Sequence, residues 1–484
     1  MYFCHVFKLS IMKLNNIYTL LIINAMLVLP LAAQDNGITP DMLSTIQKSY
    51  AKTASNKALQ NAIVNNDINK LAMSYENAGA FDSYFSNKVN SQAISDQKSS
   101  GRCWLFTGMN VLRSKTITQH DLPADFQFSQ VHIFFWDQLE KANLFLQAVI
   151  DTKNLPFDDK KVEWLFKNPI GDGGQFTGVA NLIDKYGLVP MDVMKETNSS
   201  NNTRIMSNLL SLRLREDGLR LRELSTKKGT TEASLQSTKL EMLKSIYQIL
   251  ALNLGEPPTK FNWTQRDKNG KPIETKEYTP LSFREKFANE DFSHYYMIMN
   301  DPTRDYYQVY EIEYDRHMYD GNNWKYLNLP MEEIAEMAIA SIKDSTMMYF
   351  SCDVGKFLDR EKGFLDVHNY DYTSLLGVDF TMDKKERVMT FASGSSHAMT
   401  LCAVDLNDQG KPNKWMVENS WGASYGYKGF LIMTNDWFNE YMFRLVIEDK
   451  YISAKNLKLF ENKPIILPPW DPMFAPEDES IFNY

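Results

Sequence analysis

Cysteine is scarce in this chain of 484 residues, which contains four. Cys4 lies in an N-terminal segment that we expect to be removed, and the other three, Cys103, Cys352 and Cys402, have no close spacing. Three scattered cysteines predict neither a disulfide framework nor a zinc site. Any single cysteine in a polar loop is then of interest for its reactivity.

An excess of positive charge is also missing, since 52 Lys and Arg face 60 Asp and Glu, for a net charge of -8. This acidity argues against general affinity for nucleic acid. The basic residues between 198 and 260 alternate with acidic ones and lack an aromatic platform, which favours a solvated helical insertion over a nucleic-acid patch. The basic residues are Arg204, Arg213, Arg215, Arg220, Arg222, Lys227 and Lys228.

The chain also has few long apolar runs. The main one, from Ile17 to Leu31, is about 15 residues long, shorter than the ~20 needed to span a membrane. Lys8 and Lys13 precede it and Ala33 follows, a pattern that predicts a secretory signal over residues 1–33. We therefore expect export to the periplasm or the extracellular space, with no membrane span after cleavage. The alternative is an uncleaved membrane anchor.

The remaining sequence is globular in composition, with 44% hydrophobic residues. Residues 34–82 predict an arm of one or two amphipathic helices, and 83–197 a helical lobe in which Ser129 caps a helix over 130–150. Residues 261–463 predict a β-rich lobe, and 464–484 a C-terminal arm. The fold class predicted is α+β with two packed lobes. Strands are expected at Tyr307 to Tyr314, Met347 to Cys352, Arg387 to Phe391, His397 to Val404, Lys414 to Glu418 and Gly429 to Met433.

Cys103 stands where a polar loop, Ser99-Ser-Gly101, gives way to a dense apolar run that predicts a helix. At the first turn of a helix, unpaired backbone N–H groups and the macrodipole favour thiolate over thiol. Cys103 is therefore a candidate nucleophile, although most free cysteines are inert core residues. Cys352 and Cys402 lie within apolar strand runs, and we interpret both as core.

A thiolate nucleophile needs a general base, which is usually histidine. His397 follows Gly394-Ser-Ser and begins a predicted strand, whereas the surroundings of His120, His294, His317 and His368 give no comparable signal and His132 is interpreted as a core or surface residue. Asn419 can orient an imidazole, and Trp421 can shield it from water. Gln97 can donate its amide N–H to a developing oxyanion, beside the backbone N–H of Cys103.

The segments QKSSGRCWLF, SHAM and VENSWG resemble the active-site segments of papain-like cysteine peptidases, specifically the bleomycin hydrolase and bacterial aminopeptidase C group. The resemblance extends to FWDQLEKAN, DGGQFTGVANLIDKYGLVP, SCDVGKF and LPPWDPM. It covers nearly the whole mature chain, from about Ser83 to Met473.

The resemblance implies a papain-like fold with a helical insertion, placed here at 198–260, and a hexameric ring. It implies Cys103 as nucleophile, His397 as base and acid, Asn419 as orienting group and Gln97 as oxyanion donor, with Trp421 covering the His397 and Asn419 pair. Gly173 and Gly174 are similar to the glycine pair that binds the substrate backbone in papain-like enzymes, which agrees with the close approach that paired glycines allow. No metal or cofactor is required.

The end of the chain departs from the family pattern, in which the terminal carboxylate holds the substrate's amino group. Here Met473 is followed by eleven residues, among them Glu477, Asp478 and Glu479. The tail is either trimmed, or overfills the cleft, or uses these acids as amine anchors. The signal segment is a second departure, because the best-known relatives are cytosolic.

The leading hypothesis is an exported, broad-specificity aminopeptidase that acts on peptides. An endopeptidase is the alternative if the altered tail leaves the cleft open. From another class, an inactive peptide- or nucleic-acid-binding ring remains as a third hypothesis.

Overall fold

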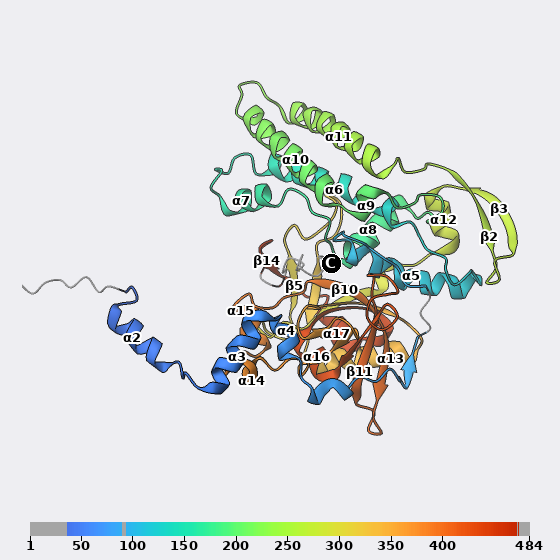
Figure 1. Cartoon of the computed structure of the whole chain (residues 1–484). Coiled ribbons are helices and arrows are strands. Elements are labelled where there is room, and N and C mark those ends of the chain that lie inside the picture. The colour runs from blue at the N-terminus through green and yellow to red at the C-terminus, as the bar shows by residue number, and fades with distance from the viewer. Residues whose placement is uncertain (1–35, 90–92, 472, 474–484) are drawn as a thin grey trace, which may run out of the picture. The chain divides into compact units, whose positions relative to one another are not determined.

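The computed structural model describes residues 36–89, 93–471 and 473 of the chain (Figure 1). The predicted signal segment and the residues after Met473 lie outside this range. The chain forms two compact units, one up to Leu71 and one from Ala72 onwards. From residue 36 onwards, where the structure describes it, the first unit is helical, and this part contains three helices where one or two were expected. They are α2 (Pro40–Ser49), α3 (Ala54–Asn65) and α4 (Ile68–Ala72), the last of which ends at the boundary.

The second unit begins with a helical lobe. Its core helices are α5 (Cys103–His120), α6 (Gln130–Asp151), α7 (Lys160–Lys167), α8 (Phe176–Tyr186) and α12 (Pro280–Phe287). Ser129 caps α6 as predicted, because its Oγ accepts the N–H of His132 at 3.2 Å. A hairpin of β2 (Phe261–Arg266) and β3 (Pro272–Tyr278) completes this lobe.

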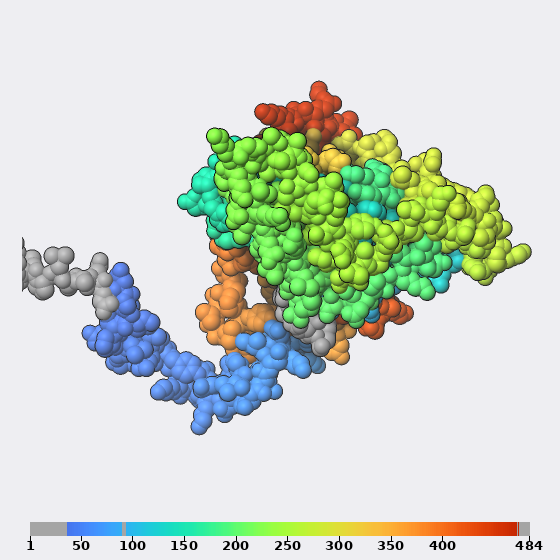
Figure 2. Space-filling view, turned by 90° about the horizontal axis from the view of Figure 1, so that it is seen from above, coloured from blue at the N-terminus to red at the C-terminus, as the bar shows by residue number. Residues whose placement is uncertain are grey.

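The basic stretch is helical and consists of α9 (Asn198–Asn201), α10 (Arg204–Ser225) and α11 (Glu232–Leu254). Both long helices pack on α6, and Figure 2 shows their green and yellow-green residues over one face. Several of the arginines are already engaged: Arg213 pairs with Asp217 at 2.8 Å, and Arg215 donates to the carbonyl of Phe166 at 2.9 Å. This agrees with a packed helical insertion.

A mixed sheet of twelve strands forms the second lobe, in the order β14-β5-β6-β4-β13-β7-β10-β11-β12-β9-β8, with β1 also pairing with β10. The strands are β1 (Asn87–Lys88), β4 (Tyr295–Met299), β5 (Val309–Ile312), β6 (Lys325–Asn328), β7 (Met348–Cys352), β8 (Leu358–Asp359), β9 (Phe364–Leu365), β10 (His397–Leu406), β11 (Pro412–Glu418), β12 (Phe430–Thr434), β13 (Met442–Glu448) and β14 (Ile465–Leu467). The helices beside them are α13 (Met331–Lys343), α14 (Tyr372–Leu376), α15 (Lys384–Met389), α16 (Asn435–Tyr441) and α17 (Ala454–Leu459).

The predicted strand at Arg387 to Phe391 is wrong. Residues 387–389 instead form the end of helix α15, with Thr390 as its C-cap. The helix starts at a capping box: the Asp383 side chain accepts the N–H of Glu386, and the Glu386 side chain accepts the N–H of Asp383. The two acids satisfy backbone donors at the helix start and outweigh the strand preference of Val388. The other five expected strands are confirmed.

The α+β division is confirmed, and the two lobes have separate hydrophobic cores. One core is formed mainly by the helices and contains Trp104 and Phe134, and the other lies in the sheet lobe and contains Phe350 and Trp415. Helix α5 packs against β10 and β7 and so joins the lobes (Figure 1). Cys103 begins α5 and His397 begins β10, so the junction carries both.

Candidate active site

Cys103 is the first residue of α5, as the sequence predicts, and its side chain is almost fully buried. The loop before it is tied internally, since Gln97 Nε2 donates to the Ser100 carbonyl and Ser100 Oγ donates to the Gln97 carbonyl, both at 2.6 Å. The helix start provides unpaired N–H groups and a positive partial charge near the sulfur. This environment favours a thiolate.

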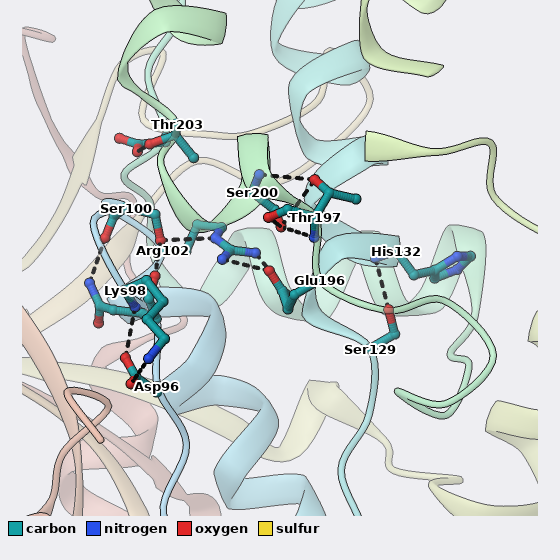
Figure 3. Close-up of polar contacts among 12 residues, drawn as sticks. Asp96, Lys98, Ser100, Arg102, Ser129, His132, Glu196, Thr197, Ser200 and Thr203 are labelled. Atoms are coloured by element: carbon teal, nitrogen blue, oxygen red, sulfur yellow. Dashed lines mark hydrogen bonds and ion pairs between the residues drawn. The ribbon is translucent and has the colours of Figure 1, made fainter. Parts of the chain in front are cut away.

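Arg102 anchors the residue before the cysteine. Its guanidinium is buried and forms an ion pair with Glu196 at 2.8 Å (Figure 3). Its Nε also donates to Ser100 Oγ at 3.0 Å. A buried ion pair with several hydrogen bonds fixes geometry even where its net stabilisation is small. The backbone at Cys103 is therefore held from the helical lobe.

His397 is buried at the start of β10, and its Nε2 lies 2.9 Å from Asn419 Oδ1. The same Oδ1 accepts the backbone N–H of Ser420 at 2.8 Å. Because a backbone N–H can only donate, this contact identifies the oxygen of the amide, and Nε2 of His397 must then carry the proton. In the neutral ring the lone pair lies on Nδ1, which can accept a proton.

Trp421 covers this pair, as the resemblance implies. Its ring centroid lies 4.7 Å from that of His397. Asp96, in the loop before Cys103, pairs with Trp421 as an isolated antiparallel bridge. The aromatic face excludes water from the imidazole, which strengthens the hydrogen bond to Asn419.

Gln97 connects the cysteine loop to the His397 and Asn419 pair. Its N–H donates to the Ser420 carbonyl at 2.8 Å, and its Oε1 accepts from Ser420 Oγ at 2.6 Å. The buried ion pair of Arg113 in α5 with Glu418, which precedes Asn419, reinforces the connection at 2.8 Å. The structure thus brings Gln97, Cys103, His397 and Asn419 into one region. The amide of Gln97 has a second N–H besides the one bonded to Ser100.

The two glycines of the GDGGQ loop differ in their surroundings. A Cβ on Gly174 would lie 2.1 Å from His317 Cε1 and 2.8 Å from Trp104, so packing alone requires glycine there. A Cβ on Gly173 would meet no atom within 4 Å. Gly173 therefore leaves room for the close approach of another backbone, while Gly174 supports the loop from within.

Sequence reasoning missed Asp172, which joins the glycine loop to the cysteine loop. Its Oδ2 accepts the N–H of Gly101 at 2.7 Å, and its carbonyl accepts the indole N–H of Trp104 at 2.8 Å. Its Oδ2 also accepts from Thr203 Oγ1 at 2.5 Å. The motif DGGQ includes this residue, but nothing in its spacing indicates a partner 71 residues away.

The C-terminal arm reaches the same region. Its last described residue, Met473, is buried, and its carbonyl accepts the N–H of Ser395 and Nη2 of Arg444, both at 3.2 Å. Arg444 Nη1 donates to Gln175 Oε1 at 3.0 Å. Ser395 lies two residues before His397, and Gln175 follows the glycine pair. The arm is thus bonded to the segment before His397 and is linked through Arg444 to the residue after the glycine pair.

Cys352 and Cys402 are fully buried in β7 and β10, and burial raises the pKa of both thiols. Both are therefore poor nucleophiles. In the described part of the chain, no three His, Cys, Asp or Glu side chains gather in a way that would hold a metal ion. The described helices also include none with the length and apolarity to cross a membrane.

Comparison with known proteins decides the family. Residues 37–474 match the model of the peptidase C1-like family. The chain belongs to the peptidase C1-like family. It is therefore a cysteine peptidase by family, and the family assignment made from the motifs is confirmed.

Relatives of this peptidase align over most of its length. Aminopeptidase C of Streptococcus thermophilus is 36% identical over 439 residues, which cover 90% of this chain and 98% of that protein. Bleomycin hydrolase of Mus musculus is 38% identical over 391 residues, which cover 79% of this chain and 86% of that protein. The crystal structure of PepW from Lactobacillus rhamnosis is 38% identical, with a TM-score of 0.87 over 91% of this chain and 99% of that one. The papain-like fold expected from the sequence is confirmed.

Proposed function

We propose that this peptidase is a broad-specificity aminopeptidase that uses Cys103, His397 and Asn419. The observation that carries the proposal is the orientation of His397, whose Nε2–H is held by Asn419 so that Nδ1 is the basic nitrogen. The relatives named aminopeptidase C support the same activity.

In the first step, the Cys103 thiolate attacks the carbonyl carbon of the amino-terminal residue. The oxyanion is stabilised by the N–H of Cys103 and the second amide N–H of Gln97. His397, protonated at Nδ1, gives its proton to the leaving nitrogen as the C–N bond breaks, which leaves a thioester. Water then attacks the thioester while His397 accepts its proton, and the C–S bond breaks to release the amino acid. No metal or cofactor takes part in these steps.

The test combines labelling and turnover. Iodoacetamide near pH 6 is expected to label Cys103 and not Cys352 or Cys402, and the wild-type protein is expected to hydrolyse an aminoacyl fluorophore. Cys103→Ser should abolish both the labelling and the hydrolysis of the fluorophore. Reactive Cys103 without turnover would instead favour the third hypothesis, a binding ring. Labelling of Cys352 or Cys402 alone would contradict the assignment of the nucleophile.

We further propose that the C-terminal arm restricts the enzyme to amino-terminal cleavage. The hydrogen bonds of the Met473 carbonyl to Ser395 and to Arg444, which in turn bonds Gln175, support this role. Residues 474–484 lie outside the described structure, and their deletion tests whether Glu477, Asp478 and Glu479 anchor the substrate amine. An unchanged preference for free over acetyl-blocked peptides would exclude anchoring by these acids. A gain of internal cleavage would identify the tail as the barrier to endopeptidase activity.

Export and a hexameric assembly are also part of the proposal. The charge and apolar pattern of residues 1–33 supports export, and the family resemblance supports the hexamer. N-terminal sequencing of the protein from the periplasm or medium should find a start after Ala33. Light scattering should give six times the mass of one chain, and a monomer mass would contradict the assembly.

A further inference from the structure

A second buried histidine lies behind the glycine loop. His317 Nδ1 lies 2.5 Å from Asp137 Oδ1, and His317 Nε2 lies 3.1 Å from the backbone nitrogen of Gln175. The N–H of Gln175 can only donate, so Nε2 carries no proton and Nδ1–H donates to Asp137. His317 is therefore neutral, with one fixed tautomer and both nitrogens engaged.

The electrostatics agree with this assignment. Burial and the nearby Lys141 ammonium lower the pKa of His317, and the Asp137 carboxylate opposes them. Burial would raise the pKa of Asp137, but Lys141, at 2.9 Å, and His317 together lower it. Asp137 thus stays ionised, which keeps the proton of the neutral imidazole on Nδ1.

The ring of His317 fills the space between three elements of the site. A Cβ on Gly174 would lie 2.1 Å from the ring, and a Cβ on Gly178 in α8 would lie 2.3 Å from it. The indole of Trp104, the residue after Cys103, lies 4.5 Å away between ring centroids. The imidazole therefore sets the spacing of the glycine loop, α8 and the start of α5.

Lys141 holds two carbonyl groups of the loop. Lys141 Nζ donates to the carbonyls of Gly171 and Gly173, at 3.1 and 2.6 Å. His317 instead holds an N–H, that of Gln175. Nε2 of His317 accepts this N–H and so fixes the peptide plane between Gly174 and Gln175. The space beside Gly173 stays open.

We propose that His317 is a positioning residue for substrate binding. With its tautomer fixed by Asp137, it holds the glycine loop in the conformation that receives the substrate backbone. The inference rests on the proposed function, in which that loop binds peptide. It assigns His317 no part in proton transfer, because a proton on Nε2 would place two N–H groups against each other.

Two amide substitutions separate the roles of the two ring nitrogens. In His317→Gln the side-chain oxygen can take the place of Nε2 and accept the N–H of Gln175. In His317→Asn the amide nitrogen can take the place of Nδ1 and donate to Asp137, but the acceptor for Gln175 is lost. We expect His317→Asn to raise KM for a fluorogenic peptide with a free amino terminus about tenfold, the size expected for one hydrogen bond. His317→Gln should stay within about threefold of wild type.

Both variants should keep kcat within about threefold and leave the alkylation rate of Cys103 unchanged, because the catalytic pair is not altered. Asp137→Asn permits the other tautomer and should give an intermediate rise in KM. The matched control is His132→Asn, since His132 is another buried histidine of the helical lobe and its Nε2 lies beside the carbonyl of Tyr186. It should leave KM unchanged even if it lowers thermal stability.

Equal KM values for His317→Asn and His317→Gln would overturn the inference, as would a fall in kcat without a change in KM. If His317→Asn does not fold, the Asp137→Asn variant is used to test the inference. An unchanged KM in that variant rejects the inference, and a raised KM with normal kcat supports it. Failure of the wild-type enzyme to hydrolyse peptides would reject the proposed function instead. The two failures are therefore distinguishable.

Discussion

The surroundings of His397 and His317 are built from similar groups but differ at one ring nitrogen. Each places a buried imidazole beside an indole, 4.7 Å away for His397 and 4.5 Å for His317, and each bonds one ring nitrogen to a side-chain oxygen. The difference lies in the second nitrogen. For His317 a backbone N–H occupies it, whereas the tautomer of His397 places the lone pair of the ring on Nδ1. In the proposed mechanism the second ring nitrogen therefore separates the two histidines, and burial or an aromatic neighbour does not.

The largest expected effect comes from removing the imidazole of His397, which the proposed mechanism uses as base. His397→Ala should lower kcat by about 10⁴-fold, because a nucleophile that loses its base loses most of the chemical step. Steady-state kinetics with an aminoacyl fluorophore measures this. Under the same conditions His317→Asn should keep most of its kcat. Comparable losses of kcat in the two variants would show that both histidines transfer protons.

His132 is a third buried histidine and extends the comparison. Its Nε2 lies 3.5 Å from the Tyr186 carbonyl, where His397 has an amide partner and His317 a carboxylate. Burial lowers the pKa of His132 to about 4. Below pH 6.5 the unfolded chain binds a proton that the folded chain does not take up until about pH 4, so stability falls in this window. The loss at pH 4 is about 3 kcal/mol.

Urea denaturation of the wild type and of His132→Phe between pH 7.5 and 4 measures this loss. The variant lacks the titrating group, so its stability should fall less over the same range. Parallel curves for the two proteins would show that His132 is protonated in the folded state at much higher pH.

The smallest of these effects concerns the orienting partner. Asn419→Ala removes the acceptor of Nε2–H, so that His397 can adopt either tautomer and rotate. We expect kcat to fall about 10²-fold with little change in KM, within the usual range for acid–base catalysis. Asn419→Asp keeps an acceptor and should retain more activity than the alanine variant. If both variants matched wild type, orientation of the imidazole would not limit the rate.

The residues found from sequence were those with local signals. Cys103 lies at a switch from polar loop to apolar helix, and His397 and Asn419 lie at strand ends within short motifs. The dense apolar run after Cys103 and the cap at Ser129 also predicted their helices correctly. Local chemistry and the family motifs together were enough to assemble the candidate site.

The residues that were missed depend on distant partners. His317 lies between Arg316 and Met318 in irregular chain, 180 residues from Asp137, and nothing local indicates that it is buried. Asp172 was visible in its motif, but its role depends on Gly101 and Trp104. At Arg387 to Phe391 the aromatic and β-branched residues suggested a strand. The acidic residues that start the helix, Asp383 and Glu386, both precede this segment.

The contacts between Gln97 and Ser420, and between Arg113 and Glu418, bear on how the enzyme loses activity during denaturation. They join the two lobes next to the candidate catalytic residues. Separation of the lobes and misalignment of Cys103 with His397 are then the same event. Catalytic activity during denaturation should therefore report on the association of the lobes, and an intact but inactive intermediate should not accumulate.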